Sequence, residues 1–363
     1  MSKIIPVSYE SKPCYKIVLE QDFEQLMEYV KELGYRSSQK ICIVTDSNLE
    51  ALHLQELKSI FDSYFEKVIS FSFSAGEESK NLDTVQKLYE ELIIHHFDRQ
   101  DILVAFGGGV VGDLTGFTAA TYLRGIDFIQ IPTSLLSQVD SSIGGKTGVD
   151  FSQYKNMVGA FYQPRLVYMN LSLLQTLPKE QFISGMGEIL KHGLIKSKAY
   201  FEWMKSNYEA IMSLEPEAVE EMVYQSCLIK RNVVENDPKE KGERALLNFG
   251  HTLGHAIEKL SDFSLFHGQC VGIGMAAAAY LSKELGHISE NEYMEILDVF
   301  KHFGLPVSVS GLLAQDILEV SKSDKKMVAG KIKFILLEAV GCAYINPNLT
   351  DGQLMSAIES VLK

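Results

Sequence analysis

Histidine and glutamate recur at helical spacing in the second half of the chain. Glu188 and His192 are four residues apart, as are His251 and His255, and His267 follows. Residues at i and i+4 share one face of a helix, and neutral imidazole and carboxylate together suit zinc. A catalytic zinc ion keeps three protein ligands and one open position, so the spacing offers more ligands than one ion needs. We predict a divalent-cation site and leave its ligand set open, because a hydrogen-bonded, partly buried role is the alternative for any single histidine.

A glycine-rich turn follows a predicted strand in the first half of the chain. The strand at 101–106 leads directly into GGGVVGD, residues 107–113, and a helix-like stretch covers 114–122. Glycines let the backbone approach a pyrophosphate, and the following helix N-terminus directs N–H groups towards it. The pattern predicts nucleotide binding, although a tight packing turn has a similar sequence. Asp46, at the end of another strand, is placed either to accept hydrogen bonds from a ribose or to cap a helix.

Polar and cationic residues gather between positions 131 and 164. Arg124, Lys146 and Lys155 could form a local positive pocket for an anionic substrate, and Asp140 could accept hydrogen bonds from its hydroxyls. Taken singly, each is better explained as a solvated surface charge. A P-loop is excluded, because its pattern requires a glycine at position 140, and that residue is Asp140.

The composition is typical of a soluble globular protein of about two domains. The chain has 363 residues, 46% of them hydrophobic, and its 34 Lys and Arg against 47 Asp and Glu give a formal net charge of −13. This charge argues against nucleic acid or an anionic membrane surface as a partner. The five cysteines are scattered and never spaced C-x-x-C, which favours a reducing cytoplasm. Because residues 1–12 contain no continuous apolar stretch, we expect neither secretion nor membrane insertion.

Two hydrophobic periodicities alternate in the first half, which predicts a parallel βαβ sheet covered by helices. The expected strands are 41–45, 68–73, 102–106 and 128–131, and helical spacing occurs around 22–33, 49–61 and 82–94. Beyond Pro178 the spacing is helical over 181–226, 246–260 and 271–285, with little strand before 332–337. We predict an α/β domain at 1–178 with the glycine-rich turn, a mainly α-helical domain at 179–363, and a mobile loop at 235–244.

A series of longer motifs runs along the chain in one order: GGGVVGDLTGFTAATYLRG, IPTSLLSQVDSSIGGKTGVD, KNMVGAFYQP, TLP, GMGEILKHGLI, LLNFGHTLGHAIE, HG and DKK. In order and spacing they resemble the 3-dehydroquinate synthase family, within the sugar phosphate cyclases, over essentially the whole chain. The resemblance implies an N-terminal NAD-binding α/β domain, a zinc-bearing helical domain, a homodimer and an active site in the interdomain cleft. Gln269 and Gly187 depart from the family's usual Glu and Ala, at positions without an assigned chemical role.

The same resemblance implies a role for individual side chains. The metal, zinc with cobalt as an alternative, would be bound by Glu188, His251 and His267, which leaves His255 to catalysis and His192 to neither role. The implied catalytic residues are Asp140, Lys146, Asn156, Lys191 and His255, and the implied substrate contacts are Arg124, Lys230, Arg244, Asn248 and Lys325. The implied NAD contacts are Asp46, Asn48, Glu77, Lys80, Gly109, Val110, Val111, Gly112, Asp113, Thr133, Ser134, Lys155 and Thr176.

The implied reaction converts the sugar phosphate 3-deoxy-D-arabino-heptulosonate 7-phosphate to 3-dehydroquinate and phosphate, a step of the shikimate pathway. It combines transient NAD-dependent oxidation, phosphate elimination, reduction and intramolecular aldol closure. The rival interpretations are another sugar phosphate cyclase, a metal-dependent polyol dehydrogenase of related fold, and a catalytically silent binding subunit. The set of cations that match a phosphate and a carboxylate favours the synthase.

Overall fold

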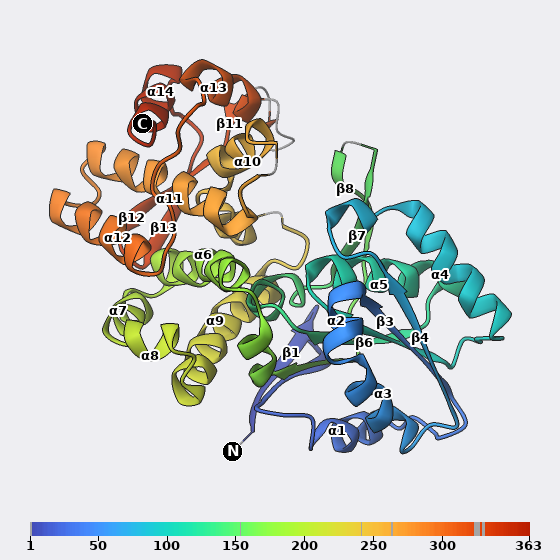
Figure 1. Cartoon of the computed structure of the whole chain (residues 1–363). Helices are drawn as coiled ribbons and strands as arrows, with labels where there is room; N and C mark the ends of the chain where they lie inside the picture. Colours follow the sequence, from blue (N-terminus) through green and yellow to red (C-terminus); the bar gives the residue numbers. More distant parts are fainter. Residues whose placement is uncertain (1, 153, 241, 263, 323–326, 329–330) are drawn as a thin grey trace. The chain divides into compact units, whose positions relative to one another are not determined.

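Strands and helices alternate through the first half and give way to helices in the second. The computed structural model describes every residue except 1, 153, 241, 263, 323–326 and 329–330, and the chain divides into two units, Met1–Leu177 and Pro178–Lys363 (Figure 1). Among the helices described, none is both long and apolar enough to cross a membrane. The predicted fold class, a parallel-dominated α/β sheet followed by a mainly helical region, is confirmed.

The main sheet of unit 1 is parallel except at one edge, where β1 and β2 form an antiparallel hairpin. In spatial order its strands are β1 (Lys3–Tyr9), β2 (Lys12–Glu20), β9 (Leu166–Asn170), β6 (Asp127–Pro132), β5 (Ile102–Gly107), β3 (Lys40–Asp46) and β4 (Lys67–Phe73). Unit 1 also contains the helices α1 (Leu26–Glu32), α2 (Ser47–Leu52), α3 (Leu54–Asp62), α4 (Leu82–Ile94) and α5 (Gly109–Thr121), and the short turns η1 (Glu77–Ser79), η2 (Tyr122–Arg124), η3 (Ser137–Ser141) and η4 (Leu171–Thr176).

Helices cover both faces of this sheet because successive strand residues point to opposite sides. Ile41 and Ile43 of β3 belong to a core shared with apolar residues of α1 and α3. Cys42 and Val44 belong to a second core with residues of α4 and α5. All four side chains are fully buried. The two cores hold the carboxyl ends of β3, β5 and β6 side by side at one end of the sheet. The glycine-rich turn begins at this end.

A hairpin of β7 (Lys146–Phe151) and β8 (Tyr154–Phe161) packs against α5. The contact is close at Gly116, where an added Cβ would lie 2.4 Å from Cγ2 of Thr147. The backbone N–H of Asp150 also donates to the carbonyl oxygen of Lys80 at 2.8 Å. The hairpin is therefore fixed to α5 and to the segment that follows η1.

Unit 2 is mainly helical, with short antiparallel strand pairs near its end. Its elements are α6 (Lys179–Lys196), α7 (Lys198–Ser206), α8 (Tyr208–Met212), α9 (Pro216–Asn236), η5 (Glu243–Asn248), α10 (His251–Leu260), α11 (His267–Glu284), α12 (Glu290–His302), α13 (Ala314–Lys322), β10 (Met327–Val328), β11 (Lys331–Ile332), β12 (Phe334–Ala339), β13 (Cys342–Asn346) and α14 (Asp351–Glu359) (Figure 1).

Several local predictions differ from the structure. The stretch 49–61 forms two helices, because the chain leaves helical geometry at His53, where φ is −138°. The expected loop at 235–244 is shorter, since α9 continues to Asn236 and η5 begins at Glu243. The β1–β2 and β7–β8 hairpins and β9 were not predicted. Pro6 weakens the strand signal of β1, and the polar residues and glycines of β7 and β8 weaken theirs. The apolar residues of β9 carry a strand signal that was missed.

Candidate functional site

Three helices of unit 2 bring together the cluster of predicted metal ligands. Glu188 lies in α6, His251 and His255 lie in the first two turns of α10, and His267 is the first residue of α11. Each histidine offers a ring nitrogen within 4.8 Å of those of the other two. Oε1 of Glu188 lies 3.5 Å from Nε2 of His251 and 3.9 Å from Nε2 of His267. Three imidazoles thus face one small volume, and the carboxylate of Glu188 lies beside two of them, His251 and His267.

Glycines allow these helices to approach closely enough to form the cluster. An added Cβ at Gly268 of α11 would lie 1.8 Å from the carbonyl oxygen of Ser184 in α6, and one at Gly274 would lie 1.9 Å from the carbonyl oxygen of Gly250. Neither distance is possible for a real side chain, so the α11 backbone contacts α6 and the start of α10 directly. This contact sets the separation between Glu188 and the histidines.

Hydrogen bonds determine which nitrogen of two histidines faces the carboxylate. Nδ1 of His251 lies 3.2 Å from the carbonyl oxygen of Phe249, which can only accept, so Nδ1 carries the proton. Nδ1 of His267 lies 3.2 Å from Oε2 of Glu258, which favours the same tautomer. Both Nε2 atoms then present a lone pair towards Glu188. Two lone pairs beside a carboxylate fit a bound cation, and second-shell partners of this kind are typical of metal-ligating histidines.

The carboxylate of Glu188 provides a second test of whether a cation fits. Its side chain is 1% exposed, one oxygen pairs with Lys191, and the other, Oε1, has no hydrogen-bond partner among the described residues. A buried carboxylate oxygen left in this state is costly unless a cation or donor meets it. The donor set of carboxylate and imidazole is that of a zinc or cobalt site. The residues present therefore fit a divalent cation.

The electrostatic surroundings of His267 act in two directions. Burial disfavours its protonated form, but the hydrogen bond to Glu258 and the negative charges of Glu188 and Glu258 outweigh burial and raise the pKa of His267 above its ordinary value. The carboxylates of Glu188 and Glu258 therefore favour a positive charge at or beside the ring of His267.

His192 has a different environment from the other three histidines. It is fully buried, and its Nδ1 lies 2.7 Å from the hydroxyl oxygen of Ser226 in α9. This contact fits a hydrogen-bonded core histidine, but a ring nitrogen of His192 also lies within 4.8 Å of a carboxylate oxygen of Glu188. His255, by contrast, is half-buried and its ring centroid lies 5.2 Å from that of His251. Geometry thus places His255 with the metal candidates, although the resemblance implies a catalytic role.

Glu258 was missed by the sequence reasoning. It lies in α10 seven residues after His251 and is 8% exposed. The signal that could have found it is helical: positions i and i+7 lie on the same face, so an acidic residue there can approach a site that begins at His251.

The remaining substrate candidates of unit 2 lie in α9 and η5. Lys230 and Arg244 are buried, at 5% and 3% exposure, and Nη1 of Arg244 donates to the carbonyl oxygen of Pro238 at 2.8 Å. Nδ2 of Asn248 donates to Oε1 of Glu240 at 3.1 Å. Lys325, predicted to contact substrate, lies outside the described residues.

In unit 1, the glycine-rich turn joins the carboxyl end of β5 to α5. Gly108 is the N-cap residue and provides no side-chain cap for the first-turn N–H groups, while Gly109, Val110, Val111 and Gly112 form that turn. The backbone N–H of Thr133, beyond β6, donates to the carbonyl oxygen of Gly107 at 3.0 Å. The hydroxyl oxygen of Ser134 lies 3.5 Å from a Cβ built at Gly108. The predicted nucleotide residues of α5 and those just beyond β6 therefore lie together at the carboxyl end of the sheet.

The other predicted nucleotide residues occupy neighbouring strand ends and turns. Oδ1 of Asp46 accepts from the backbone N–H groups of Asn48 and Leu49 at 2.9 and 3.1 Å, so Asp46 caps α2. The hydroxyl oxygen of Thr176 lies 2.9 Å from Nε2 of His53.

Lys80 joins several predicted site residues of unit 1. Its Nζ lies 2.8 Å from Oδ2 of Asp113 and 3.5 Å from Oε1 of Glu77, and it donates to Oδ1 of Asn156 at 2.7 Å. The cofactor candidates Asp113 and Glu77 are thereby linked to a predicted catalytic residue.

The other charged candidates of unit 1 are distributed among its connecting segments. Arg124 is exposed at the end of η2 with a φ of +70°, and Asp140 is half-buried in η3. Lys146 is exposed at the start of β7, and Lys155 is half-buried in β8.

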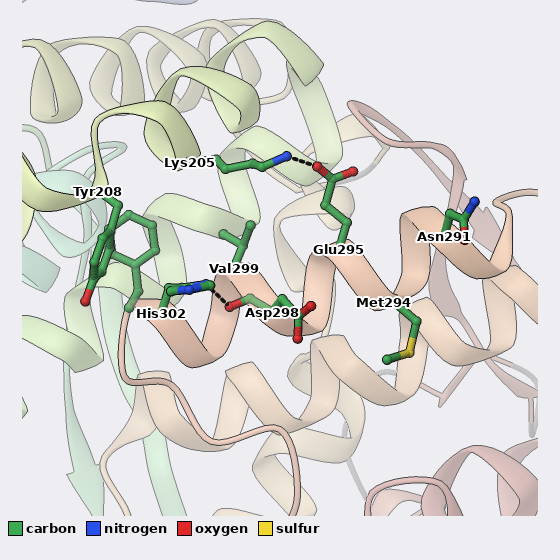
Figure 2. A pocket seen from close by; sticks show the side chains of 9 residues that line it. Lys205, Tyr208, Asn291, Met294, Glu295, Asp298, Val299 and His302 are labelled. Carbon is green, nitrogen blue, oxygen red and sulfur yellow. Dashed lines mark hydrogen bonds and ion pairs between the residues drawn. The ribbon is translucent and has the colours of Figure 1, made fainter.

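A separate pocket of about 640 Å³ lies in unit 2 on the surface of α7, α8 and α12, and none of the predicted site residues lines it. Figure 2 shows Lys205 paired with Glu295 and the ring of His302 beside Tyr208. The pocket is lined by Lys205, Tyr208, Asn291, Met294, Glu295, Asp298, Val299, His302 and Phe303.

Comparison with solved structures first defines the class of fold. A 2-deoxy-scyllo-inosose synthase, solved with carbaglucose-6-phosphate, NAD+ and Co2+, superposes with a TM-score of 0.89 at 24% identity, over 99% of this chain and 100% of the other. A 2-epi-5-epi-valiolone synthase from Streptomyces hygroscopicus subsp. jinggangensis, with NAD+ and Zn2+ bound, gives 0.88 at 24% identity over 98% of each chain. The fold is that of these sugar phosphate cyclases.

Sequence comparison then identifies the family. Residues 70–184 match the family model described as 3-dehydroquinate synthase N-terminal, and residues 185–327 match 3-dehydroquinate synthase C-terminal. A 3-dehydroquinate synthase of Ruminiclostridium cellulolyticum is 40% identical over 327 residues, 90% of each chain. The chain belongs to the 3-dehydroquinate synthase family.

Proposed function

We propose that the chain converts 3-deoxy-D-arabino-heptulosonate 7-phosphate to 3-dehydroquinate and phosphate. The observation that carries this function is the 40% identity to a 3-dehydroquinate synthase over 90% of both chains. The cluster of Glu188, His251, His255 and His267 supports it, because the reaction needs a polarised hydroxyl and the cluster fits a cation that polarises one. The cofactors are NAD and a divalent cation, zinc or cobalt.

The metal ligands of this proposal are Glu188, His251 and His267. When bound, the metal polarises a substrate hydroxyl and NAD takes up and returns two electrons, so no net oxidation results. Phe249 and Glu258 hold the two imidazoles with Nε2 directed to the metal position. A metal ligand must be deprotonated at Nε2, and a neutral imidazole whose single proton is on Nδ1 meets that requirement.

Lys191 and His255 are the proposed proton-handling groups beside the metal. The ammonium of Lys191 is 1% exposed and paired with Glu188, which places a fixed positive charge next to that ligand. His255 is half-buried, and its ring lies 5.6 Å, centroid to centroid, from that of His267. An imidazole in this position can accept and return a substrate proton near neutral pH.

Binding of the substrate is assigned to residues of both units. Asp140, Lys146, Asn156 and Arg124 are the proposed contacts in unit 1, and Lys230, Arg244 and Asn248 are those in unit 2. Positioning is central, because elimination and ring closure depend on the conformation of a held intermediate. The buried guanidinium of Arg244, at 3% exposure, is the proposed partner of the substrate carboxylate, since its planar fork matches a carboxylate.

NAD binding is assigned to the carboxyl end of the parallel strands in unit 1. The pyrophosphate would meet the uncapped first turn of α5 after Gly108, where N–H groups and the helix dipole favour negative charge. We further propose that the protein works in the cytoplasm as a homodimer, as the family resemblance implies.

Product identification and one substitution test the proposed function. Wild type with the heptulosonate phosphate and catalytic NAD should yield 3-dehydroquinate, identified by NMR, and should discriminate against an analogue without the carboxylate. Arg244→Ala should lose about 30-fold to several thousand-fold in kcat/KM, because a desolvated carboxylate is left unpaired, and Arg244→Lys should recover only part of the loss. Metal content and NAD affinity are the controls and should not change. Equal use of the two substrates would favour a different sugar phosphate cyclase reaction.

A further inference from the structure

Helix α11 begins at His267 without a cap from its own segment. Its N-cap residue is Phe266, whose side chain makes no capping hydrogen bond. The first N–H groups of a helix have no partner within the helix, so a buried one needs an acceptor from elsewhere. The N–H of Gly268 finds this acceptor in α6, where it donates to the hydroxyl oxygen of Ser184 at 3.0 Å. Ser184 therefore caps a helix to which it does not belong.

We propose that Ser184 is a positioning residue for the metal site, and that its hydroxyl sets where His267 lies relative to Glu188. The proposal rests on the proposed function, since it takes Glu188 and His267 as metal ligands. It concerns the hydroxyl group of Ser184, which is distinct from the backbone contact that the same residue makes with Gly268.

The hydrogen bond acts on the backbone of His267 itself. The N–H of Gly268 and the carbonyl of His267 belong to one planar peptide unit, which is attached to Cα of His267. Holding this N–H therefore restricts the backbone from which the imidazole extends. The ring is held separately, because Nδ1 of His267 lies 3.2 Å from Oε2 of Glu258. The backbone of this ligand is thus held from α6, and its ring is held from α10.

One face of α6 carries both the capping hydroxyl and the other ligand. Ser184 and Glu188 are four residues apart within α6, so they lie on one face, one helical turn apart. Both side chains are buried, and Oε1 of Glu188 lies 3.9 Å from Nε2 of His267. The hydrogen bond therefore joins α6 and α11 one turn away from the point where their two ligands meet.

Close packing makes the hydroxyl difficult to replace. A Cβ added at Gly187 would lie 2.7 Å from the carbonyl oxygen of Gly268, and one added at Gly268 would lie 1.8 Å from that of Ser184. Backbones in direct contact on both sides of the hydrogen bond leave little room for a water molecule in place of the hydroxyl. Loss of the hydroxyl therefore leaves the buried N–H of Gly268 without this acceptor, and the first turn of α11 loses its cap.

Zinc affinity tests the proposal without any substrate. Ser184→Ala should weaken zinc binding by about tenfold, as is typical when a group that orients a metal ligand is lost. The matched control is Ser282→Ala, in the second half of α11, where the N–H of Leu337 donates to the buried Ser282 hydroxyl at 3.0 Å. Both variants should lower the melting temperature of the zinc-free protein by roughly 2–4 °C, but Ser282→Ala should keep wild-type zinc affinity. Wild-type zinc affinity in Ser184→Ala, or an equal loss in Ser282→Ala, would overturn the proposal.

A double-mutant cycle identifies the ligand through which Ser184 acts. In a His267→Ala background, Ser184→Ala should change zinc affinity by less than about twofold, because the ligand that it positions has been removed. In a His251→Ala background the loss should stay near about tenfold, since His251 lies on α10 and His267 is still present. Additive losses with His267→Ala would show a general effect on folding and would overturn the proposal.

Two further measurements report on the contact and on the ligand geometry. In zinc-free protein, the amide of Gly268 should exchange with deuterium at least about tenfold faster in Ser184→Ala than in wild type, and at the wild-type rate in Ser282→Ala. In cobalt-loaded protein, the visible absorption bands should shift in Ser184→Ala, because they depend on the geometry of the ligands. Unchanged exchange or an unchanged spectrum would each overturn the inference. A wild type that makes no 3-dehydroquinate would instead overturn the proposed function, so the two failures are distinguishable.

Discussion

At the scale of single residues, the proposed metal site depends on two histidines whose ring orientation is set by neighbours. Phe249 and Glu258 engage Nδ1 of His251 and His267, and both Nε2 atoms then face a buried carboxylate. His192 has the same side-chain chemistry but lies against Ser226. The difference between these histidines is one of surroundings, which spacing along a helix does not reveal.

We predict that His267→Ala and His192→Gln differ in metal content. His267→Ala should lose at least about tenfold in affinity for zinc, because a three-ligand site does not readily replace a ligand. His192→Gln keeps a polar side chain near Ser226 and should retain the metal content of wild type. Both values can be obtained by competition with a chromophoric chelator. Equal losses would show that the ligand set is wrong.

Glu258 provides a separate prediction at this scale. Glu258→Gln should weaken zinc binding by roughly 10- to 100-fold, because it removes the charge that orients His267 and increases its basicity. The matched control is Glu292→Gln, at the capping box of α12 in the same unit, which should affect stability only. If both glutamine variants bind zinc as wild type does, Glu258 has no part in holding the metal ligand.

At the scale of elements, the site depends on how closely helices approach. The sequence predicts that α10 and α11 are helices, but the expected ranges 246–260 and 271–285 miss their starts at His251 and His267. The resemblance supplies the ligand positions as a prediction. The sequence does not show that Gly268 contacts Ser184, because this backbone contact depends on where the neighbouring helix α6 lies. The β7–β8 hairpin was missed for a related reason: it is stabilised by α5 and Lys80, not by a strong strand pattern of its own.

We predict that Gly268→Ala disrupts the metal site through this helix contact. The added Cβ would lie 1.8 Å from the carbonyl oxygen of Ser184, so α6 and α11 must separate, at a cost of about 1–3 kcal/mol in the free energy of unfolding. The affinity for zinc should fall by at least about tenfold, since Glu188 and His267 move apart.

Gly272→Ala is the control on the same helix, because its Cβ would meet the carbonyl oxygen of Pro306 at 3.4 Å, an ordinary contact. It should leave both stability and metal affinity near wild type. Unfolding monitored by circular dichroism and zinc competition measure the two effects. Wild-type zinc affinity in Gly268→Ala would show that the helix contact does not set the ligand geometry.

At the scale of the whole molecule, the two units carry different parts of the proposed chemistry. The proposed NAD contacts lie in unit 1, where the strands β3, β4, β5 and β6 were predicted from their apolar and β-branched runs, but the order of strands in the sheet was not. The proposed metal ligands lie in unit 2. The links from Lys80 to Asn156 and from Glu258 to His267 join residues far apart in sequence or unremarkable in type, so they were found only from the structure.

The most direct test of the central claim counts phosphate released against NAD supplied. The protein is loaded with zinc and a limiting amount of NAD and incubated with excess heptulosonate phosphate, while phosphate and the absorbance of NADH are followed together. Because NAD is restored in each turnover, phosphate should exceed NAD by on the order of a hundredfold or more, with no accumulation of NADH. NADH formed in proportion to product would contradict the synthase function and indicate a dehydrogenase.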